Sequence, residues 1–364
     1  MNSEIQDIPR SFEGIGYVRS PNGFPLQSVQ VPVPRPGPDQ VLIHTAYSSL
    51  NPLDYKLADL NFFKRTPPVI LGLDLAGTVI AVGGRVKGFD VGDQVAAMAD
   101  CNGDGGWATG GRGGYALARD YYTTRKPGSL SFVEAAALPL CFIAAHLGLE
   151  RNVEEGDVVY IPGGAGGVGH LAIRMARNIF KAGTVVSSGS TAESMALARA
   201  SGADHVFNYK QDNIATQIAQ LTQGRGVDVV FDLTYSEQSF IDSARMVRDG
   251  GKWIVLGVGP GKTTRTTETE SPVAGILADR GARMLHVNML RYFQDPDLVD
   301  DAVRAYFSNA LRSAMDWAVD GRVKPHVDRI IPSRVDEINA ALAAMKSGKS
   351  PVGKVVVQID LEVE

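Results

Sequence analysis

Three glycines in the spacing GxGxxG, within residues 164–169, lie between a strand pattern and a helix pattern. The strand pattern is VVYIPGG (158–164), and apolar residues follow at helical spacing over 168–179. In this context the first glycine permits a tight turn, the second lets a diphosphate approach the backbone, and the third lets the helix pack on the strand. Free N–H groups at the helix start then face the phosphates. We predict a dinucleotide site, with a ligand-free turn as the alternative, formed by Gly164, Ala165, Gly166, Gly167, Val168 and Gly169.

Strand and helix patterns alternate after this loop. Strand patterns occupy 158–164, 184–190, 205–209, 227–234, 252–259 and 284–288, and further helix patterns occupy 192–202, 214–224 and 239–251. Such alternation predicts a parallel sheet with helices on both faces. The predicted fold class is therefore α/β, with a doubly wound, dinucleotide-binding domain over residues 140–310.

The residue patterns at the two ends of the chain differ from those of this middle part. β-branched residues bounded by turn residues concentrate in the first third, notably at 41–50 and 74–83, which indicates many short strands. Helix patterns at 295–321 and 334–348 precede a last strand pattern at 353–359. We predict a β-rich lobe over residues 1–139 and a C-terminal segment, 311–364, that returns to it.

Composition excludes several classes of protein. The 36 Lys and Arg residues against 40 Asp and Glu give a net charge of −4, so we expect no nucleic-acid or membrane partner. The longest apolar stretch, 135–149, contains Pro139 and His146 and is too short to span a bilayer. Cys101 and Cys141 can form neither a disulfide framework nor a four-thiolate zinc site. The N-terminal residues lack the pattern of a secretory signal, so we expect a cytoplasmic protein.

The end of the second strand of the sheet indicates which dinucleotide binds. NAD sites place an acidic residue about 20 residues beyond the glycines, but this strand ends in SSGST (187–191) and the first acid is Glu193. Hydroxyls and N–H groups can accept a 2′-phosphate that a carboxylate would repel. We therefore predict NADPH as the coenzyme, held in part by Ser188 and Ser190; the alternative is that these serines only solvate a loop.

A second glycine-rich segment, GVGPGKT (257–263), resembles a phosphate-binding loop of nucleotide triphosphatases. Its glycine spacing is one residue short, and it follows the fifth strand of the sheet instead of the first. We assign Gly257 to the coenzyme site and expect residues 259–271 to form a polar loop beside that site.

Further motifs recur along nearly the whole chain, namely NPLD (51–54), GLDLAGTVIAVG (72–83), FDVGD (89–93), EAAALPL (134–140), GGAGGVG (163–169), SGADHVFNY (201–209) and GKV (353–355). Together they resemble the medium-chain dehydrogenase/reductase superfamily, nearest its zinc-independent quinone oxidoreductase (zeta-crystallin-like) branch. The resemblance implies a GroES-like β lobe, a Rossmann lobe and an active site in the cleft between them. It also implies a homodimer or homotetramer.

The resemblance implies that no metal ion takes part. Zinc-dependent members bind the catalytic ion through a Cys, a His–Glu pair and a second Cys or its equivalent, whereas the matching places here carry Asn51, Leu73-Asp74 and about Leu140. We therefore predict no metal site. A nicotinamide can deliver hydride unaided to a strongly electrophilic acceptor. The predicted function is an NADPH:quinone oxidoreductase whose partner is a small quinone or conjugated carbonyl compound.

The resemblance also implies roles for single residues. Asn51 would lie near the nicotinamide and donate a hydrogen bond to a carbonyl that gains negative charge, unless it only caps the turn before Pro52. Lys56 would bind a cofactor or substrate oxygen, or lie solvated on the surface, and Tyr55 would line an aromatic pocket. Tyr209 matches a tyrosine beside the adenosine phosphate.

Three features leave other functions open. Lysine at the position of Lys56 is typical of enoyl and 2-alkenal reductases, so reduction of an enone double bond is one alternative. Ala144 lacks a hydroxyl that commonly contacts the nicotinamide, and Ser194 replaces a phosphate-pairing lysine of many NADPH-dependent members. A nucleotide-binding, non-enzymatic crystallin-like protein is therefore the second alternative.

Overall fold

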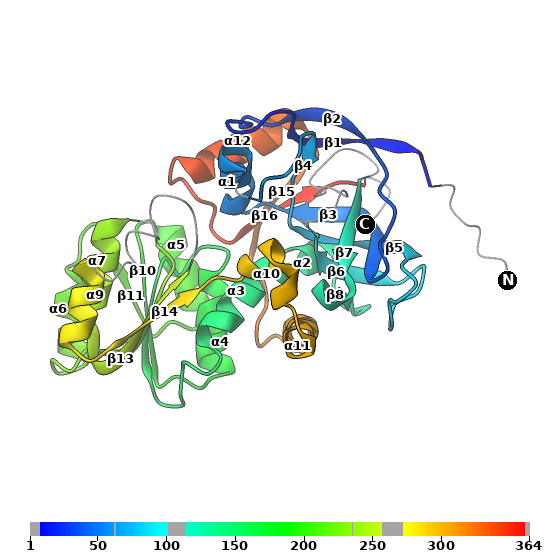
Figure 1. Cartoon of the computed structure of the whole chain (residues 1–364). Helices are drawn as coiled ribbons and strands as arrows, with labels where there is room; N and C mark the ends of the chain where they lie inside the picture. The colour runs from blue at the N-terminus through cyan, green and yellow to red at the C-terminus, as the bar shows by residue number, and fades with distance from the viewer. Residues whose placement is uncertain (1–7, 62, 101–113, 235, 257–271, 361–364) are drawn as a thin grey trace. The chain divides into compact units, whose positions relative to one another are not determined.

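The computed structural model describes residues 8–61, 63–100, 114–234, 236–256 and 272–360 of the 364-residue chain (Figure 1). The chain divides into two compact units. The first comprises Met1–Leu140, Tyr292–Val319 and Pro325–Glu364, and the second comprises Cys141–Arg291 and Asp320–Lys324. None of the described helices combines the length and the apolar composition that crossing a lipid bilayer requires.

The first unit is built on two sheets. A three-stranded antiparallel sheet has the order β2-β1-β4, and a larger sheet has the order β15-β16-β3-β5-β6-β8, with β7 also paired to β3. The strands are β1 (Ser11–Tyr17), β2 (Gln27–Pro32), β3 (Gln40–Ser49), β4 (Val69–Ile70), β5 (Asp74–Val82), β6 (Gln94–Met98), β7 (Tyr115–Arg119), β8 (Thr123–Arg125), β15 (Val327–Pro332) and β16 (Lys354–Gln358). Inward-facing apolar residues of β3, β5, β6 and β7 form its core, as expected for a β-rich lobe.

Helices complete this unit. They are α1 (Pro52–Leu60), η1 (Asp120–Tyr122), α2 (Phe132–Ala136), α10 (Arg291–Gln294), η2 (Pro296–Leu298), α11 (Asp301–Val319) and α12 (Val335–Lys346), and α3 (Pro139–Leu149) begins at its end. Residues 292–310 belong to the first unit, whereas the prediction placed them in the dinucleotide-binding domain. The aromatic rings explain the difference: Phe293 and Phe307 lie 4.7 and 4.9 Å from the ring of Tyr122, and this contact holds the segment on the first unit.

The second unit contains one six-stranded sheet of the order β11-β10-β9-β12-β13-β14, in which every pair is parallel. Its strands are β9 (Val158–Pro162), β10 (Thr184–Gly189), β11 (His205–Asn208), β12 (Val227–Asp232), β13 (Val247–Leu256) and β14 (Arg283–Val287). The chain moves outward from β9 in one direction and then, from β12, in the other. Ligands of such sheets bind at the carboxyl ends of the strands where this reversal occurs.

Helices cover both faces of that sheet, which confirms the predicted doubly wound α/β class. They are α4 (Gly169–Asn178), α5 (Ala192–Ala200), α6 (Ile214–Leu221), α7 (Glu237–Arg245) and α9 (Pro272–Asp279). Figure 1 shows α6, α7 and α9 gathered on one face and α4 on the other. The ring of Trp253 meets that of Phe240 edge to face at 5.8 Å in the core between sheet and helices.

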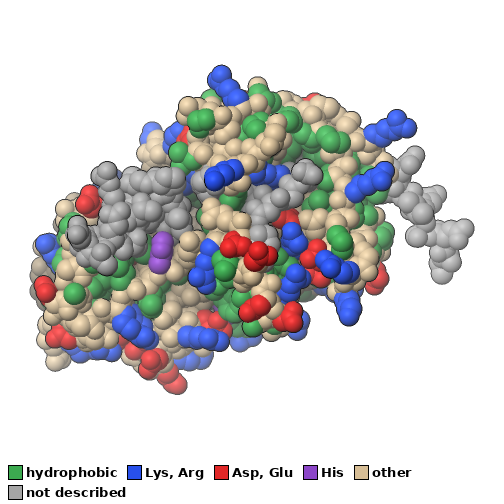
Figure 2. All heavy atoms as spheres, in the orientation of Figure 1, with side chains coloured by type: hydrophobic (Ala, Val, Ile, Leu, Met, Phe, Trp, Pro, Cys, Tyr) green, Lys and Arg blue, Asp and Glu red, His purple; other side chains and the backbone are tan. Residues whose placement is uncertain are grey.

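Charges are mixed on the surface drawn in Figure 2, where Lys and Arg side chains alternate with Asp and Glu over the described residues. No broad area of this face carries basic side chains alone.

Candidate functional site

The glycine loop between β9 and α4 has the geometry that a dinucleotide requires. A Cβ atom on Gly164 would overlap Ser187 Oγ, and one on Gly169 would overlap the carbonyl oxygen of Gly163, so both positions exclude any side chain. Gly166 is different, because the nearest atom to its Cβ position is the Gly163 oxygen, at 3.5 Å. The loop is therefore closed where helix and strand pack and open where a diphosphate would approach.

Hydrogen bonds fix the conformation of this loop. The Gly166 N–H donates to the Gly163 carbonyl at 3.1 Å, and the Gly166 carbonyl accepts the N–H of His170 at 3.2 Å. The Nδ1 atom of the buried His170 lies 2.8 Å from the same carbonyl oxygen. In the sequence, the available signal for this contact is the spacing of four residues between His170 and the second glycine.

The end of β10 differs in detail from what the sequence suggested. Ser188 is buried, and its hydroxyl lies 3.3 Å from that of Tyr160. The Oγ atom of Ser194 accepts the N–H groups of Ser190 and Thr191 at 3.2 and 3.0 Å. These N–H groups, which we expected to bind a 2′-phosphate, are thus already paired within the protein.

The neighbouring strand brings a cation to this region that sequence reasoning missed. Gly189 pairs with Asn208, and the Tyr209 N–H donates to the Gly189 carbonyl at 3.1 Å. Tyr209 is 56% exposed, and the exposed Lys210 follows it. Within the described part of the chain, the Lys210 ammonium has no hydrogen-bond or ion-pair partner. Its position next to Tyr209 in the sequence was the available signal.

One residue assigned to the coenzyme site, Gly257, lies outside the described residues, as does the polar segment 259–271. Its role therefore stays a prediction.

In the first unit, the predicted catalytic motif lies in a buried polar cluster centred on Asp74, the first residue of β5. Its Oδ2 atom accepts hydrogen bonds from Ser49 Oγ (3.0 Å), Asn51 Nδ2 (2.8 Å) and Lys354 Nζ (3.0 Å). Its Oδ1 atom accepts the backbone N–H of Leu140 at 2.7 Å. The carboxylate thus joins the ends of β3, β5 and β16 to the first turn of α3.

Asn51 is oriented into this cluster. Its Nδ2 atom donates to Asp74 and, at 3.4 Å, to the Ser49 carbonyl, while its Oδ1 atom accepts from Lys354 Nζ at 2.8 Å. The residue is only 3% exposed. This geometry favours a structural role for the amide over the predicted hydrogen bond to a substrate carbonyl.

The places that match zinc ligands do converge, but their chemistry does not suit a metal ion. Asn51 and Leu140 contribute N–H donors, and Asp74 is paired with the ammonium of Lys354, which is itself 2% exposed. Across the described residues, no group of three or more His, Cys, Asp or Glu side chains could hold a metal ion.

Asp54, at the start of α1, is the second carboxyl of the cluster. Its Oδ2 atom accepts the Asn51 N–H at 2.8 Å, and its buried Oδ1 atom has no hydrogen-bond partner among the described residues. Complete burial raises its pKa, and the charge of Asp74 adds to this. The Asn51 hydrogen bond and Lys354 lower it only in part, so that the pKa is about 7. One ammonium therefore faces two carboxyl groups, of which Asp54 holds a proton below neutral pH.

The raised pKa of Asp54 predicts a pH dependence of stability. A carboxyl that holds its proton more tightly when folded stabilises the fold at acid pH, and this contribution is lost as the pH rises from about 4 to about 7. The loss is at most about 1.4 kcal/mol per pH unit. We expect Asp54→Asn to flatten this slope, as measured by urea unfolding at several pH values; an unchanged slope would show that Asp54 does not cause it.

The other two predicted catalytic residues, Tyr55 and Lys56, lie on α1 and are half-buried. Burial and the nearby Asp59 raise the pKa of Tyr55, so its phenol stays protonated near neutral pH. Their roles toward substrate stay predictions.

Two family models match the chain. An alcohol dehydrogenase GroES-like domain matches residues 37–130, and a zinc-binding dehydrogenase matches residues 167–300. The 2-methylene-furan-3-one reductase of Solanum lycopersicum is 30% identical over 332 residues, which are 90% of this chain and 74% of that protein. The quinone oxidoreductase of Lama guanicoe is 32% identical over 264 residues, 70% of this chain and 76% of that protein.

Solved structures agree with these relatives. An alcohol dehydrogenase superfamily protein from Novosphingobium aromaticivorans has a TM-score of 0.79 and 28% identity, with 95% of this chain and 100% of that chain covered. The quinone oxidoreductase from Coxiella burnetii has a TM-score of 0.75 and 25% identity, with 96% and 99% covered. These matches confirm a GroES-like sheet and a Rossmann-type sheet in an oxidoreductase. The chain therefore belongs to the quinone oxidoreductase family of the medium-chain dehydrogenases/reductases.

Proposed function

We propose that this oxidoreductase uses NADPH to reduce a small quinone, without a metal ion. The loop after β9 carries the proposal, because it is open at Gly166 and closed at Gly164 and Gly169. The relative from Lama guanicoe bears the name quinone oxidoreductase. When bound, the coenzyme supplies the hydride.

The chain's own residues bind and orient this coenzyme. The N–H groups at the start of α4 face the diphosphate, and His170 holds the loop carbonyl of Gly166 away from it. Tyr209 and Lys210, at the end of β11, lie beside the 2′-phosphate in this proposal. The buried cluster of Asn51, Asp54, Asp74 and Lys354 keeps α1, which carries Tyr55 and Lys56, fixed on the sheet.

The quinone assignment is tested with the purified protein, NADPH and a panel of quinones. Loss of NADPH absorbance at 340 nm with at least one quinone is the expected result, and elemental analysis should find no stoichiometric zinc. Coenzyme binding without turnover of any acceptor would instead favour the non-enzymatic, crystallin-like alternative.

Reduction of an enone double bond is the second candidate function. The relative that matches 90% of the chain bears the name 2-methylene-furan-3-one reductase. An NADPH-dependent alkenal/one oxidoreductase of Arabidopsis thaliana is 34% identical over 230 residues, 62% of this chain and 56% of that protein. Adding 2-alkenals and exocyclic enones to the acceptor panel distinguishes the two, because the preferred class has the higher kcat/KM.

In this proposal, the ammonium of Lys210 distinguishes NADPH from NADH by binding the 2′-phosphate. We expect Lys210→Ala to raise the KM for NADPH about tenfold, since one charge-assisted contact to the 2′-phosphate is worth roughly 1.5 kcal/mol, and to leave the KM for NADH unchanged. Lys210→Arg, which keeps the charge, is the matched control. Equal use of NADPH and NADH by the wild type would refute the NADPH assignment.

Two further proposals concern the whole protein. We propose a homodimer or homotetramer that forms by pairing of edge strands of the parallel sheet, in which β14 is the last strand of the described order. Light scattering gives the oligomeric state directly. A cytoplasmic location stays a prediction.

A further inference from the structure

A second candidate site lies in the Rossmann-type unit, at the amino ends of the strands. A pocket of about 520 Å³ is lined there by Gly224, Arg225, Arg248, Asp249 and Arg280. The coenzyme loop follows the carboxyl end of β9, so the two sites lie at opposite edges of one parallel sheet. Nothing in the proposed function uses these arginines.

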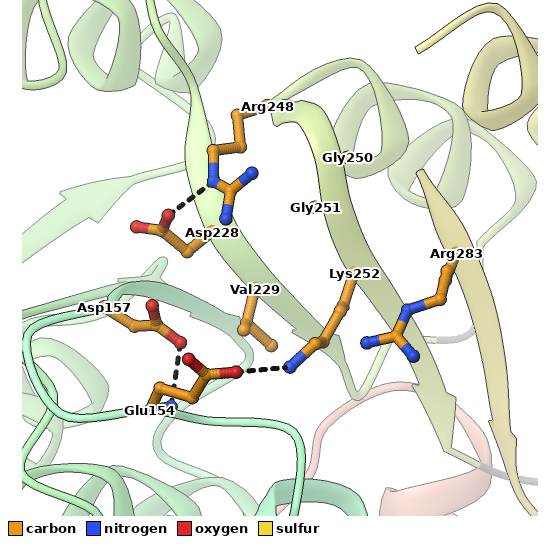
Figure 3. Close-up of a pocket in the computed structure, with 9 residues that line it drawn as sticks. All are labelled: Glu154, Asp157, Asp228, Val229, Arg248, Gly250, Gly251, Lys252 and Arg283. Carbon is orange, nitrogen blue, oxygen red and sulfur yellow. Dashed lines mark hydrogen bonds and ion pairs between the residues drawn. The ribbon is translucent and has the colours of Figure 1, made fainter. Parts of the chain in front are cut away.

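The protein itself holds two of these guanidinium groups in place. Arg225 binds Asp228 in a bidentate manner, with Nη1–Oδ1 and Nη2–Oδ2 distances of 2.7 and 3.0 Å. The Nε atom of Arg248 donates to the same carboxylate at 2.5 Å, a contact drawn in Figure 3. Burial by itself would raise the pKa of Asp228, but the hydrogen bonds from Arg225, the Val158 N–H and Arg248 lower it to about 2. Asp228 is therefore a permanent anchor for both arginines.

The remaining contacts leave donors for a ligand. Nη1 of Arg248 donates to the Asp249 carbonyl at 2.8 Å, and Nη1 of Arg280 donates to the Val247 carbonyl at 3.1 Å. A guanidinium has five N–H groups. The Nη2 atoms of Arg248 and Arg280 have no acceptor among the described residues. Arg248 and Arg280 thus each have Nη1 bound to a backbone carbonyl and Nη2 available to donate to a ligand.

The charge of the lining favours an anion in this pocket and not in its neighbour. Three arginines meet two carboxylates: Asp228, which anchors Arg225 and Arg248, and Asp249, which is 90% exposed and 3.8 Å from Arg280, so the group keeps a net positive charge. The adjoining pocket of about 190 Å³ shares Arg248, but three cations there meet three carboxylates (Figure 3). These are Arg248, Lys252 and Arg283 against Glu154, Asp157 and Asp228.

We propose that the pocket formed by Arg225, Arg248 and Arg280 binds a small multivalent oxyanion of the diphosphate type. Guanidinium groups match phosphate oxygens in bidentate geometry, and arginines that are already anchored lose little conformational freedom on binding. The volume accommodates a diphosphate with its hydration. Inorganic pyrophosphate and the diphosphate of a nucleotide share this chemistry.

Isothermal titration of the full-length protein with pyrophosphate tests the proposal. We expect Arg280→Ala to raise the Kd for pyrophosphate at least about tenfold, which corresponds to the loss of one charge-assisted hydrogen bond. Arg245→Ala is the matched control, because Arg245 is an exposed arginine of the same unit that pairs with Asp242 and does not line the pocket. Its Kd for pyrophosphate should equal that of the wild type.

Because the coenzyme loop also accepts a diphosphate, the titration is repeated with the Gly166→Val protein. Pyrophosphate binding that persists in Gly166→Val and weakens in Arg280→Ala supports the second site, and ADP in place of pyrophosphate shows whether a nucleotide is also accepted. Equal Kd values for the wild type and Arg280→Ala, or binding abolished by Gly166→Val, would overturn the proposal. Neither result depends on reductase activity.

Discussion

Gly166→Val is expected to weaken NADPH binding at least about 100-fold, a loss of roughly 2.7 kcal/mol, while the melting temperature stays close to that of the wild type. Among the described residues beyond its chain neighbours, the only atom within 4 Å of a Cβ at this position is 3.5 Å away, an ordinary contact distance, so the folded protein accommodates a Cβ here. The coenzyme does not, because the branched side chain occupies the space through which the diphosphate reaches the backbone. Isothermal titration with NADPH and thermal unfolding measure the two quantities.

Gly169→Ala is the matched control for this prediction. Its Cβ would overlap the Gly163 carbonyl and lie 2.7 Å from Gly164 Cα, so this smaller change should lower the melting temperature. If Gly166→Val bound NADPH as the wild type does, the open side of the loop would not be the diphosphate site.

Lys354→Met is expected to lower the free energy of unfolding by about 3–5 kcal/mol, which is the usual effect of leaving one member of a buried ion pair without its partner. Asp74 is fully buried, and Lys354 provides the formal positive charge among its hydrogen-bond donors. Methionine keeps most of the volume of lysine but not the charge. Urea unfolding monitored by circular dichroism gives the free energy.

The double variant Lys354→Met/Asp74→Asn separates charge from packing. If the uncompensated charge of Asp74 causes the loss of stability in Lys354→Met, the neutral asparagine should restore about half of the lost free energy of unfolding or more. The two substitutions then have coupled effects on stability, because the two side chains are in contact. A double variant less stable than Lys354→Met alone would mean that the ion pair is not the source of stability.

The parallel sheet could be predicted from the sequence because its signals are local. Buried strands such as Val158–Pro162 and Val227–Asp232 appear as short β-branched runs, and glycines mark the turns between elements. The predicted strand over 252–259 begins later than β13, which starts at Val247, because the polar residues Arg248–Lys252 conceal its first half.

The polar cluster could not be predicted because it is assembled from distant parts of the chain. Asp74 and Lys354 are 280 residues apart, and only the pairing of β16 with β3 and of β3 with β5 brings them together. The start of α1 depends on the same cluster and could not be predicted from local signals either. This helix begins at Pro52, spans nine residues, and has its first turn fixed by Asp54 within the cluster.

At the end of β10, the register of the neighbouring strand gives information that the local sequence does not contain. Ser188 and Ser190 suggested a phosphate site from composition, but the Ser188 hydroxyl lies beside that of Tyr160 and the Ser190 N–H donates to Ser194 Oγ. The parallel pairing of β11 with β10, which places Asn208 opposite Gly189, makes Lys210 a candidate.

The account depends most on the binding of a reduced pyridine nucleotide to the glycine loop, and fluorescence titration of the purified protein with NADPH measures this directly. We expect a saturable change in nicotinamide emission with a stoichiometry of one coenzyme per chain, reversed by an excess of NADP⁺. No change in emission with either NADPH or NADH at millimolar concentration would contradict the account.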